Sequence, residues 1–114
     1  MAQVVFYTTV NGKSPVEENI SKLANPDQAK AYSSLNFLEE HGYRLREPHV
    51  KTLKGNLKEL RFRIKPGQYR VFFFFHNQDD IVLLHSFIKK TQKTPKTAIS
   101  TALKRQKDWE NRAG

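Results

Sequence analysis

LKELRFRIKPGQYRVFFFFHNQDDIVLLHSFIKK, residues 57–90, is the stretch that decides the fold. It divides into three runs rich in apolar and aromatic residues, separated by Pro66-Gly67 and by residues 77–80, which are typical of tight turns. In the first run, apolar and charged residues alternate. Because successive side chains along a strand point to opposite faces, this run predicts one apolar face and one cationic face. We therefore expect an antiparallel meander of three strands.

The third run, residues 81–88, is apolar at nearly every position and is broken only by His85 and Ser86. A continuous apolar run of this length predicts a strand that is covered on both faces. The rest of the chain must therefore support a meander that also presents an Arg/Lys surface.

Two helices are predicted between a first strand, residues 2–9, and the meander. Ser14-Pro15-Val16-Glu17 matches a capping box with proline at the first helical position. Asn25-Pro26-Asp27-Gln28 repeats this signal and begins a longer helix, which should end near His41 at Gly42. We expect these helices to form an antiparallel hairpin on one sheet face. Residues 42–56 read as a basic connector.

A last helix is predicted after the meander. Thr94 is a good N-cap, Pro95 suits the first helical position, and the helix should run to about Asn111. The sequence thus predicts a single domain over residues 1–114. Its fold class is α+β, with an antiparallel sheet, an N-terminal helical hairpin, a C-terminal helix and the order β-α-α-β-β-β-α.

The formal net charge of +9 is unevenly distributed along the chain. Residues 1–50 hold 5 Lys/Arg and 6 Asp/Glu, whereas residues 51–114 hold 15 and 5. Such a concentrated positive field favours a polyanionic partner, most often nucleic acid, although a solvated basic surface has the same composition. The sequence contains no cysteine, no apolar run long enough to span a membrane and no export signal. We therefore expect a cytoplasmic protein.

The chemistry that the sequence offers is a cluster of cations on the strands. The sequence shows no metal-ligand spacing, no phosphate-binding glycine loop and no nucleophile elbow. We therefore expect no metal and no cofactor. Arginine binds phosphate oxygens in pairs, and clustered cations stabilise the charge that grows on a scissile phosphate. RNA supplies its own nucleophile, the 2′-hydroxyl. The pattern therefore favours metal-independent RNA cleavage, with simple solvation of a strand face as the alternative. The clustered cations are Arg61, Arg63, Arg70, Lys89 and Lys90.

Proton transfer has several candidates. A lysine among arginines has a lowered proton affinity and can act as base or acid. His76 and His85 are further acid/base candidates, although a histidine in an apolar strand, such as His85, is more often a core residue. Basic side chains of the connector and the segment after the meander can hold the RNA backbone, or can form an ordinary solvated surface. The RNA-binding candidates are His49, Lys51, Lys54, Arg63 and Lys93.

Three motifs carry a resemblance to a known family. LKGNLKELR (residues 53–61), YRVF (69–72) and LHSFIKKTQKTP (84–95) are similar to RelE/HigB-type toxins of bacterial type II toxin–antitoxin systems, closest to the phage-derived, HigB-like branch. The resemblance implies a RelE-like microbial-ribonuclease fold. It also implies cleavage of messenger RNA, usually in the ribosomal A site, by attack of the 2′-hydroxyl on the adjacent phosphate.

The same resemblance implies partners and residue roles. A cognate antitoxin, of helix-turn-helix type and encoded adjacently, should block the basic face and provide the only link to operator DNA. Arg70 matches the family's arginine after the central turn, the expected transition-state clamp. Arg61 and Arg63 match basic strand positions that contact the phosphate, and Lys89 or Lys90 matches the basic position after the last strand. Relatives carry a proton-transferring tyrosine or histidine near the C-terminus, which this chain lacks, so the general base stays open.

Two other functions remain as alternatives. Members of the same superfamily that resemble ParE bind DNA gyrase and cut no RNA, and a phage protein that only binds nucleic acid is the third reading. The combination of ELR, YR and KK favours the ribonuclease. Because we expect Arg70 to lie on a strand edge, we also expect Arg70→Ala to remove toxicity while leaving the fold intact.

Overall fold

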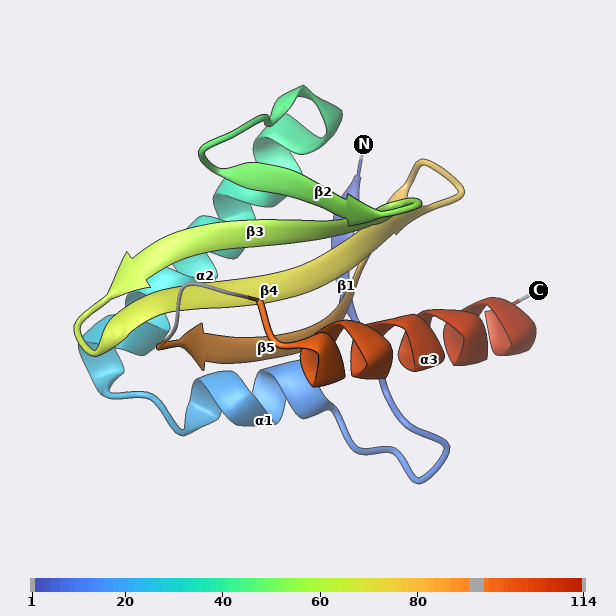
Figure 1. Cartoon of the computed structure of the whole chain (residues 1–114), viewed down its shortest axis with the longest axis horizontal. Coiled ribbons are helices and arrows are strands. Elements are labelled where there is room, and N and C mark those ends of the chain that lie inside the picture. Colours follow the sequence, from blue (N-terminus) through green and yellow to red (C-terminus); the bar gives the residue numbers. More distant parts are fainter. Residues whose placement is uncertain (1, 91–93, 114) are drawn as a thin grey trace.

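A five-stranded mixed sheet forms the centre of the computed structural model, which describes residues 2–90 and 94–113 (Figure 1). The strands lie in the order β1-β5-β4-β3-β2. The α+β class is confirmed, and β3, β4 and β5 form the expected antiparallel meander, which β2 extends at one edge. At the other edge, however, β1 pairs with β5 in parallel, so the sheet is mixed. The strands are β1 (Gln3–Phe6), β2 (Val50–Lys54), β3 (Leu57–Ile64), β4 (Gly67–His76) and β5 (Asp80–Lys89).

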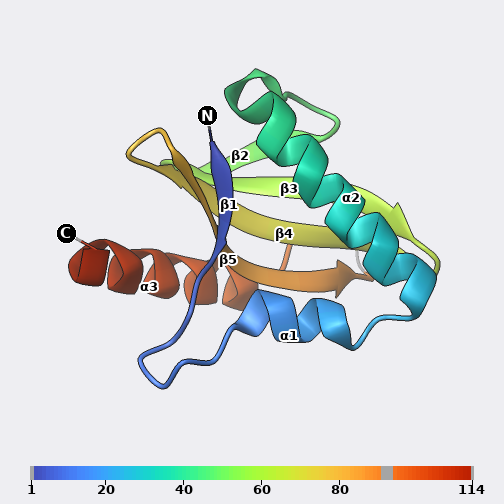
Figure 2. The same cartoon turned by 180° about the vertical axis from the view of Figure 1, so that it is seen from behind.

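Helices pack on both faces of the sheet. Helices α1 (Pro15–Ser21) and α2 (Asn25–His41) lie on one face, and α3 (Lys96–Ala113) lies on the other (Figures 1 and 2). Helix α2 ends at Gly42, as predicted, where a φ of 48° suits glycine, and the short 3-10 helix η1 (Gly42–Arg44) follows. The two faces of the sheet are therefore covered by different parts of the chain.

Alternating strand residues build a hydrophobic core on each side of the sheet. The core beneath α1 and α2 contains Leu60, Phe62, Tyr69, Val71, Phe73, Ile81 and Leu83. The core beneath α3 contains Leu57, Phe72, Phe74, Val82 and Leu84. Strand β5 contributes to both cores, which confirms the prediction that its apolar run is covered on both faces.

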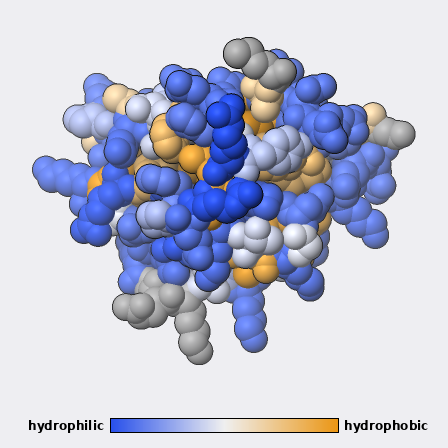
Figure 3. All heavy atoms as spheres, turned by 90° about the horizontal axis from the view of Figure 1, so that it is seen from above, coloured by the Kyte–Doolittle hydropathy of each residue, from blue (hydrophilic) through white to orange (hydrophobic). Residues whose placement is uncertain are grey.

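The predicted connector of residues 42–56 contains a strand, β2, which the sequence analysis missed. Its alternation is weak because Lys51, Thr52 and Lys54 are exposed and Val50 is its only fully buried side chain. A short edge strand with exposed lysines has the composition of a basic loop. The view onto this side of the molecule shows a mainly hydrophilic surface with small hydrophobic patches (Figure 3).

The predicted helix starts are close, but the caps differ. Ser14 is the N-cap of α1, yet its side chain makes no capping hydrogen bond, so the capping box is not formed. The N-cap of α2 is Ala24, and Asn25 is already helical. Helix α3 begins at Lys96, after Pro95, and extends beyond Asn111 to Ala113. Among the helices of the described residues, none has the length and apolar character needed to cross a membrane.

A buried tyrosine ties α1 to the sheet. The Tyr69 hydroxyl of β4 donates to Oδ1 of Asn19 in α1, at 2.5 Å, and lies 2.8 Å from Oγ of Ser86 in β5. Because a tyrosine hydroxyl has one proton, the Ser86 hydroxyl must donate to Tyr69. Burial raises the pKa of Tyr69 to about 12, so the phenol stays protonated and this network is intact at neutral pH.

We expect Tyr69→Phe to lower the free energy of unfolding by about 1–3 kcal/mol, because it removes the hydrogen-bond partner of the buried Ser86 hydroxyl and of the partly buried Asn19 amide oxygen. Urea denaturation measures this loss. Tyr32→Phe is the matched control, since Tyr32 is 41% exposed, and it should change stability far less. Equal stability of the two variants would contradict a structural role for the Tyr69 hydroxyl.

Candidate active site on the sheet

Cations gather on the sheet face that α3 covers only at one end (Figure 1). The register places Arg61 of β3 directly opposite Arg70 of β4. It also places Gln68 of β4 opposite both Arg63 of β3 and Lys89 of β5. Directly opposite residues of antiparallel strands have their Cβ atoms on the same face about 5 Å apart. Three neighbouring strands thus bring the predicted cations together.

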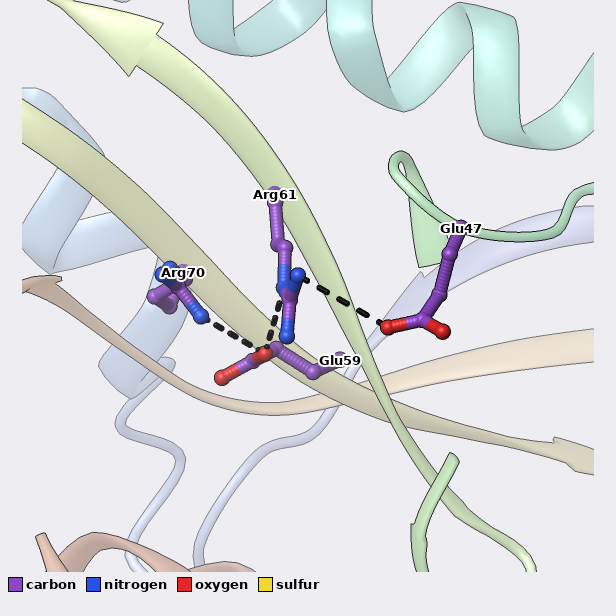
Figure 4. Close-up of polar contacts among 4 residues, drawn as sticks. All are labelled: Glu47, Glu59, Arg61 and Arg70. Atoms are coloured by element: carbon purple, nitrogen blue, oxygen red, sulfur yellow. Dashed lines mark hydrogen bonds and ion pairs between the residues drawn. The ribbon is translucent and has the colours of Figure 1, made fainter. Parts of the chain in front are cut away.

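The carboxylate of Glu59 holds two of these cations in place (Figure 4). Its Oε1 atom accepts a hydrogen bond from Nη1 of Arg70 at 2.7 Å and another from Nε of Arg61 at 2.9 Å. The Glu59 side chain is fully buried, whereas 23% of the Arg61 side chain is exposed. A buried carboxylate must be paired, and here a single oxygen is shared by two guanidinium groups.

This arrangement leaves unused hydrogen-bonding groups beside an excess of positive charge. Within the described residues, Nε of Arg70 and Oε2 of Glu59 have no hydrogen-bond partner. One carboxylate cannot neutralise two guanidinium groups, and the exposed Glu47 adds only a long contact of 4.0 Å to Arg61. Fixed guanidinium donors with net positive charge are suited to binding an oxyanion such as a phosphate.

Lys89 lies within the field of the same cluster. Burial lowers the pKa of Lys89, and the neighbouring positive charge of Arg70 lowers it further, with smaller contributions from Arg61 and Lys51. The charge of Glu59 acts in the opposite direction. Lys89 therefore releases its proton more readily than an ordinary lysine, as expected for a lysine among arginines.

His85 belongs to a different set of contacts, between β5 and α3. Nη1 of Arg105 donates to the carbonyl oxygen of Leu84 at 2.9 Å and lies 3.2 Å from Nδ1 of His85. Because a guanidinium can only donate, Nδ1 accepts and the ring proton is on Nε2. Burial, with the charge of Arg105, lowers the pKa of His85 to about 4. His85 is therefore a neutral hydrogen-bond donor at pH 7, and neither ring nitrogen is free to accept a proton.

The other sequence candidates fall into two groups. Lys51 of β2 lies opposite Glu59, and Arg63 lies two positions beyond Arg61 on the same face of β3, so both border the cluster. Lys54 ends β2, and the exposed Lys90 directly follows β5. Lys93 lies outside the described residues.

Of the two remaining histidines, His49 is a neighbour of Arg61: the Arg61 backbone N–H donates to the His49 carbonyl oxygen at 2.9 Å, and both residues line one cavity. The exposed His49 precedes β2, and its ring is 5.5 Å from the Phe37 ring of α2. His76 ends β4 and is 6.3 Å from the Trp109 ring of α3. The position of His76 gives no geometric support for a direct part in chemistry at Arg61 and Arg70, whereas His49 borders Arg61.

The position of Arg70 corrects one expectation. We expected a strand edge, but β4 is the central strand of the sheet and Arg70 is 7% exposed. Replacing it by alanine would leave the buried Glu59 carboxylate without one of its partners, which is costly. The strand-edge placement on which that expectation rested is therefore wrong, and a substitution that keeps the charge is the better test.

Sequence reasoning missed two residues that shape this region. The spacing of two between Glu59 and Arg61 places both on one strand face, but it does not show that the Glu59 carboxylate is buried. Arg105 belongs to a helix rich in exposed cations, yet its side chain turns inward to β5. No group of three metal-ligating side chains occurs among the residues that the structure describes.

Comparison with known proteins identifies the family of the chain. Residues 18–107 match the family model "Phage derived protein Gp49-like". The chain belongs to this Gp49-like family. It is also 36% identical over 109 residues to the protein named "Probable endoribonuclease HigB1" in two Mycobacterium tuberculosis strains, CDC 1551 / Oshkosh and ATCC 25618 / H37Rv. The alignment covers 96% of this chain and 85% of each relative. The resemblance to RelE/HigB-type toxins is thereby confirmed.

We expect Glu59→Gln to lower the free energy of unfolding by about 2 kcal/mol, because the two guanidinium groups lose a charged hydrogen-bond acceptor. Glu47→Gln is the matched control, since Glu47 is 67% exposed and only 4.0 Å from the same Arg61. Its effect should be below about 1 kcal/mol. Chemical denaturation of both variants measures the two free energies of unfolding. Equal decreases in the two variants would contradict the role of Glu59 in fixing the guanidinium groups.

Proposed function

We propose that this Gp49-like protein is the toxin of a type II toxin–antitoxin pair and that it cuts messenger RNA on the ribosome. The observation that carries the proposal is the pair of guanidinium groups, Arg61 and Arg70, held by the buried Glu59 on an otherwise cationic sheet face. The name of the Mycobacterium tuberculosis relatives, a probable endoribonuclease, supports the same activity.

In this proposal, Arg61 and Arg70 bind the non-bridging oxygens of the scissile phosphate. Charge on these oxygens grows as the 2′-oxygen attacks, and preorganised donors stabilise that charge without moving. Glu59 contributes by fixing the guanidinium groups before RNA arrives, which reduces the entropy lost on binding. The strand cations supply the charge stabilisation that metal ions provide in other nucleases.

The proposed reaction is an internal transfer. The 2′-hydroxyl loses its proton to a base, its oxygen forms a bond to the adjacent phosphorus, and the bond from phosphorus to the 5′-oxygen breaks. The leaving 5′-oxygen takes a proton, so the products are a 2′,3′-cyclic phosphate and a 5′-hydroxyl. We assign the donated proton to Lys89, because its pKa is lowered and its ammonium group therefore gives up a proton more readily than that of an ordinary lysine.

The partners follow from the same proposal. Messenger RNA in the ribosomal A site is the substrate. Lys51 and Arg63 border the cluster where its backbone would pass, and the exposed Lys90 directly follows Lys89. A cognate antitoxin, of helix-turn-helix type, covers the cationic face and links the pair to operator DNA. The proposed site of action is the cytoplasm.

Induced expression in bacteria, with growth and messenger-RNA 5′ ends recorded, tests the function. Wild type should arrest growth and create new 5′ ends in phase with codons. Arg70→Lys should lose both effects, because lysine keeps the charge but lacks the paired donors of a guanidinium. Arg112→Lys is the matched control, since Arg112 pairs with Asp108 near the end of α3, and it should behave like wild type.

Two outcomes would contradict the proposal. Growth arrest with intact messages would indicate a binding toxin of the gyrase type. Cutting that persists when translation is blocked would show that the ribosome is not required. Circular dichroism of purified Arg70→Lys separates lost chemistry from lost folding.

The role of Lys89 predicts a pH dependence. If its ammonium group is the acid, the single-turnover cleavage rate should fall as pH rises through the pKa of Lys89, which is below the ordinary value of 10.5. Lys89→Arg keeps the charge but cannot release a proton at these pH values, so cleavage should drop about 100-fold and lose this pH limb. RNA binding should be retained. An unchanged rate in Lys89→Arg would remove Lys89 from proton transfer.

A further inference from the structure

Next to the cation cluster lies a pocket that neither the family match nor the proposed chemistry explains. It has a volume of about 290 Å³ and is formed by β5 and the first turns of α3. Its lining residues are His85, Phe87, Pro95, Thr97, Ala98 and Thr101. Aromatic rings lie on the strand side, and small side chains lie on the helix side.

The register fixes the position of this pocket relative to the phosphate-binding arginines. Phe87 of β5 is directly opposite Arg70 of β4, so the ring and the guanidinium are cross-strand neighbours on one face. His85 precedes Phe87 by two residues, and the two ring centroids are 5.7 Å apart at an interplanar angle of 31°. Phe72 packs edge-on against Phe87, with centroids 5.3 Å apart, and supports its ring.

The pocket combines an aromatic surface with a few polar groups. His85 is neutral at pH 7 because its pKa is about 4, so it adds no charge to the pocket. Arg105 occupies its Nδ1 atom, which leaves Nε2–H as the ring's hydrogen-bond donor. Thr97 and Thr101 add hydroxyl groups. The lining residues include no Asp or Glu and no Lys or Arg.

We propose that this pocket binds one nucleobase of the RNA whose phosphate is held by Arg61 and Arg70. A base has a flat π face for the rings of Phe87 and His85, and a polar edge for the histidine N–H and the threonine hydroxyls. The neighbouring arginines select a ligand that carries a phosphate beside this flat group. The proposal rests on the proposed function for the identity of the nucleic acid, but it concerns binding and not cleavage.

Binding of uncleavable RNA tests the pocket separately from catalysis. The probes are a 2′-O-methyl trinucleotide and the three versions of it in which one base is removed. Dissociation constants for the purified full chain are measured by fluorescence anisotropy at fixed salt. For wild type, removal of one particular base should weaken binding about 10-fold, as expected for the loss of one base–aromatic stack.

The variants locate that base. Phe87→Leu should weaken the complete trinucleotide about 10-fold and leave the version that lacks this base unchanged. Thr101→Met, which fills the pocket from α3 without altering the sheet, should have the same effect and guards against a folding defect in Phe87→Leu. Arg70→Lys should weaken both probes equally, because it acts on the phosphate.

The outcomes separate the two proposals. Equal binding of all probes by wild type, equal weakening of all probes by Phe87→Leu and Thr101→Met, or no binding of any probe would each overturn the nucleobase pocket. A base-dependent difference in a protein that cuts no message would support the pocket while the proposed nuclease function failed. Message cutting without any base-dependent binding would support the proposed nuclease function and overturn the nucleobase pocket.

Discussion

The fold depends on the pairing of β4 with β5, two ten-residue strands that carry large apolar side chains on both faces. Such a strand pair is stable only when both faces are covered, so helices are needed on each side. Helices α1 and α2 cover one face. On the other face, α3 is fixed by a 2.6 Å hydrogen bond from Gln106 to Asn56 and a 2.7 Å bond from Tyr7 to Asp108. This placement leaves the cationic end of the sheet outside the area that α3 covers.

At that end, Glu59 sets the arrangement of charge. Two guanidinium groups on neighbouring strands repel each other, and in a partly buried position this repulsion is screened less than in water. The carboxylate lowers the repulsion and gives both side chains one orientation. Because one oxygen accepts both bonds, the pair keeps a net positive charge. Stability and the proposed function are thus coupled at Arg70, which lies in the central strand and carries a charge that the proposal assigns to phosphate binding.

Sequence patterns were sufficient to predict the helices and strands that are buried on one face or on both faces. Alternation identified β3, the continuous apolar run identified β5 as covered on both faces, and Gly42 marked the end of α2. Sequence patterns failed where contacts between residues far apart in the chain determine whether a residue is in a strand or is buried. Strand β2 looks like a loop because three of its five side chains are fully exposed. Glu59 could be placed on the face of Arg61, but its burial depends on Arg70, which is supplied by the pairing of β3 with β4.

The position of Arg105 shows how one helix can shape both the core and the pocket beside the arginines. The β4–β5 register shifts next to Phe72, so Leu84 is buried beneath α3 while its carbonyl group remains available to accept the Arg105 bond. The same guanidinium fixes the His85 tautomer and thereby leaves Nε2–H as the donor. A change in the docking of α3 would therefore alter the aromatic pocket before it altered the Glu59–Arg70 pair, which is made entirely within the sheet. The proposed phosphate binding and the proposed base recognition therefore rest on separate structural supports.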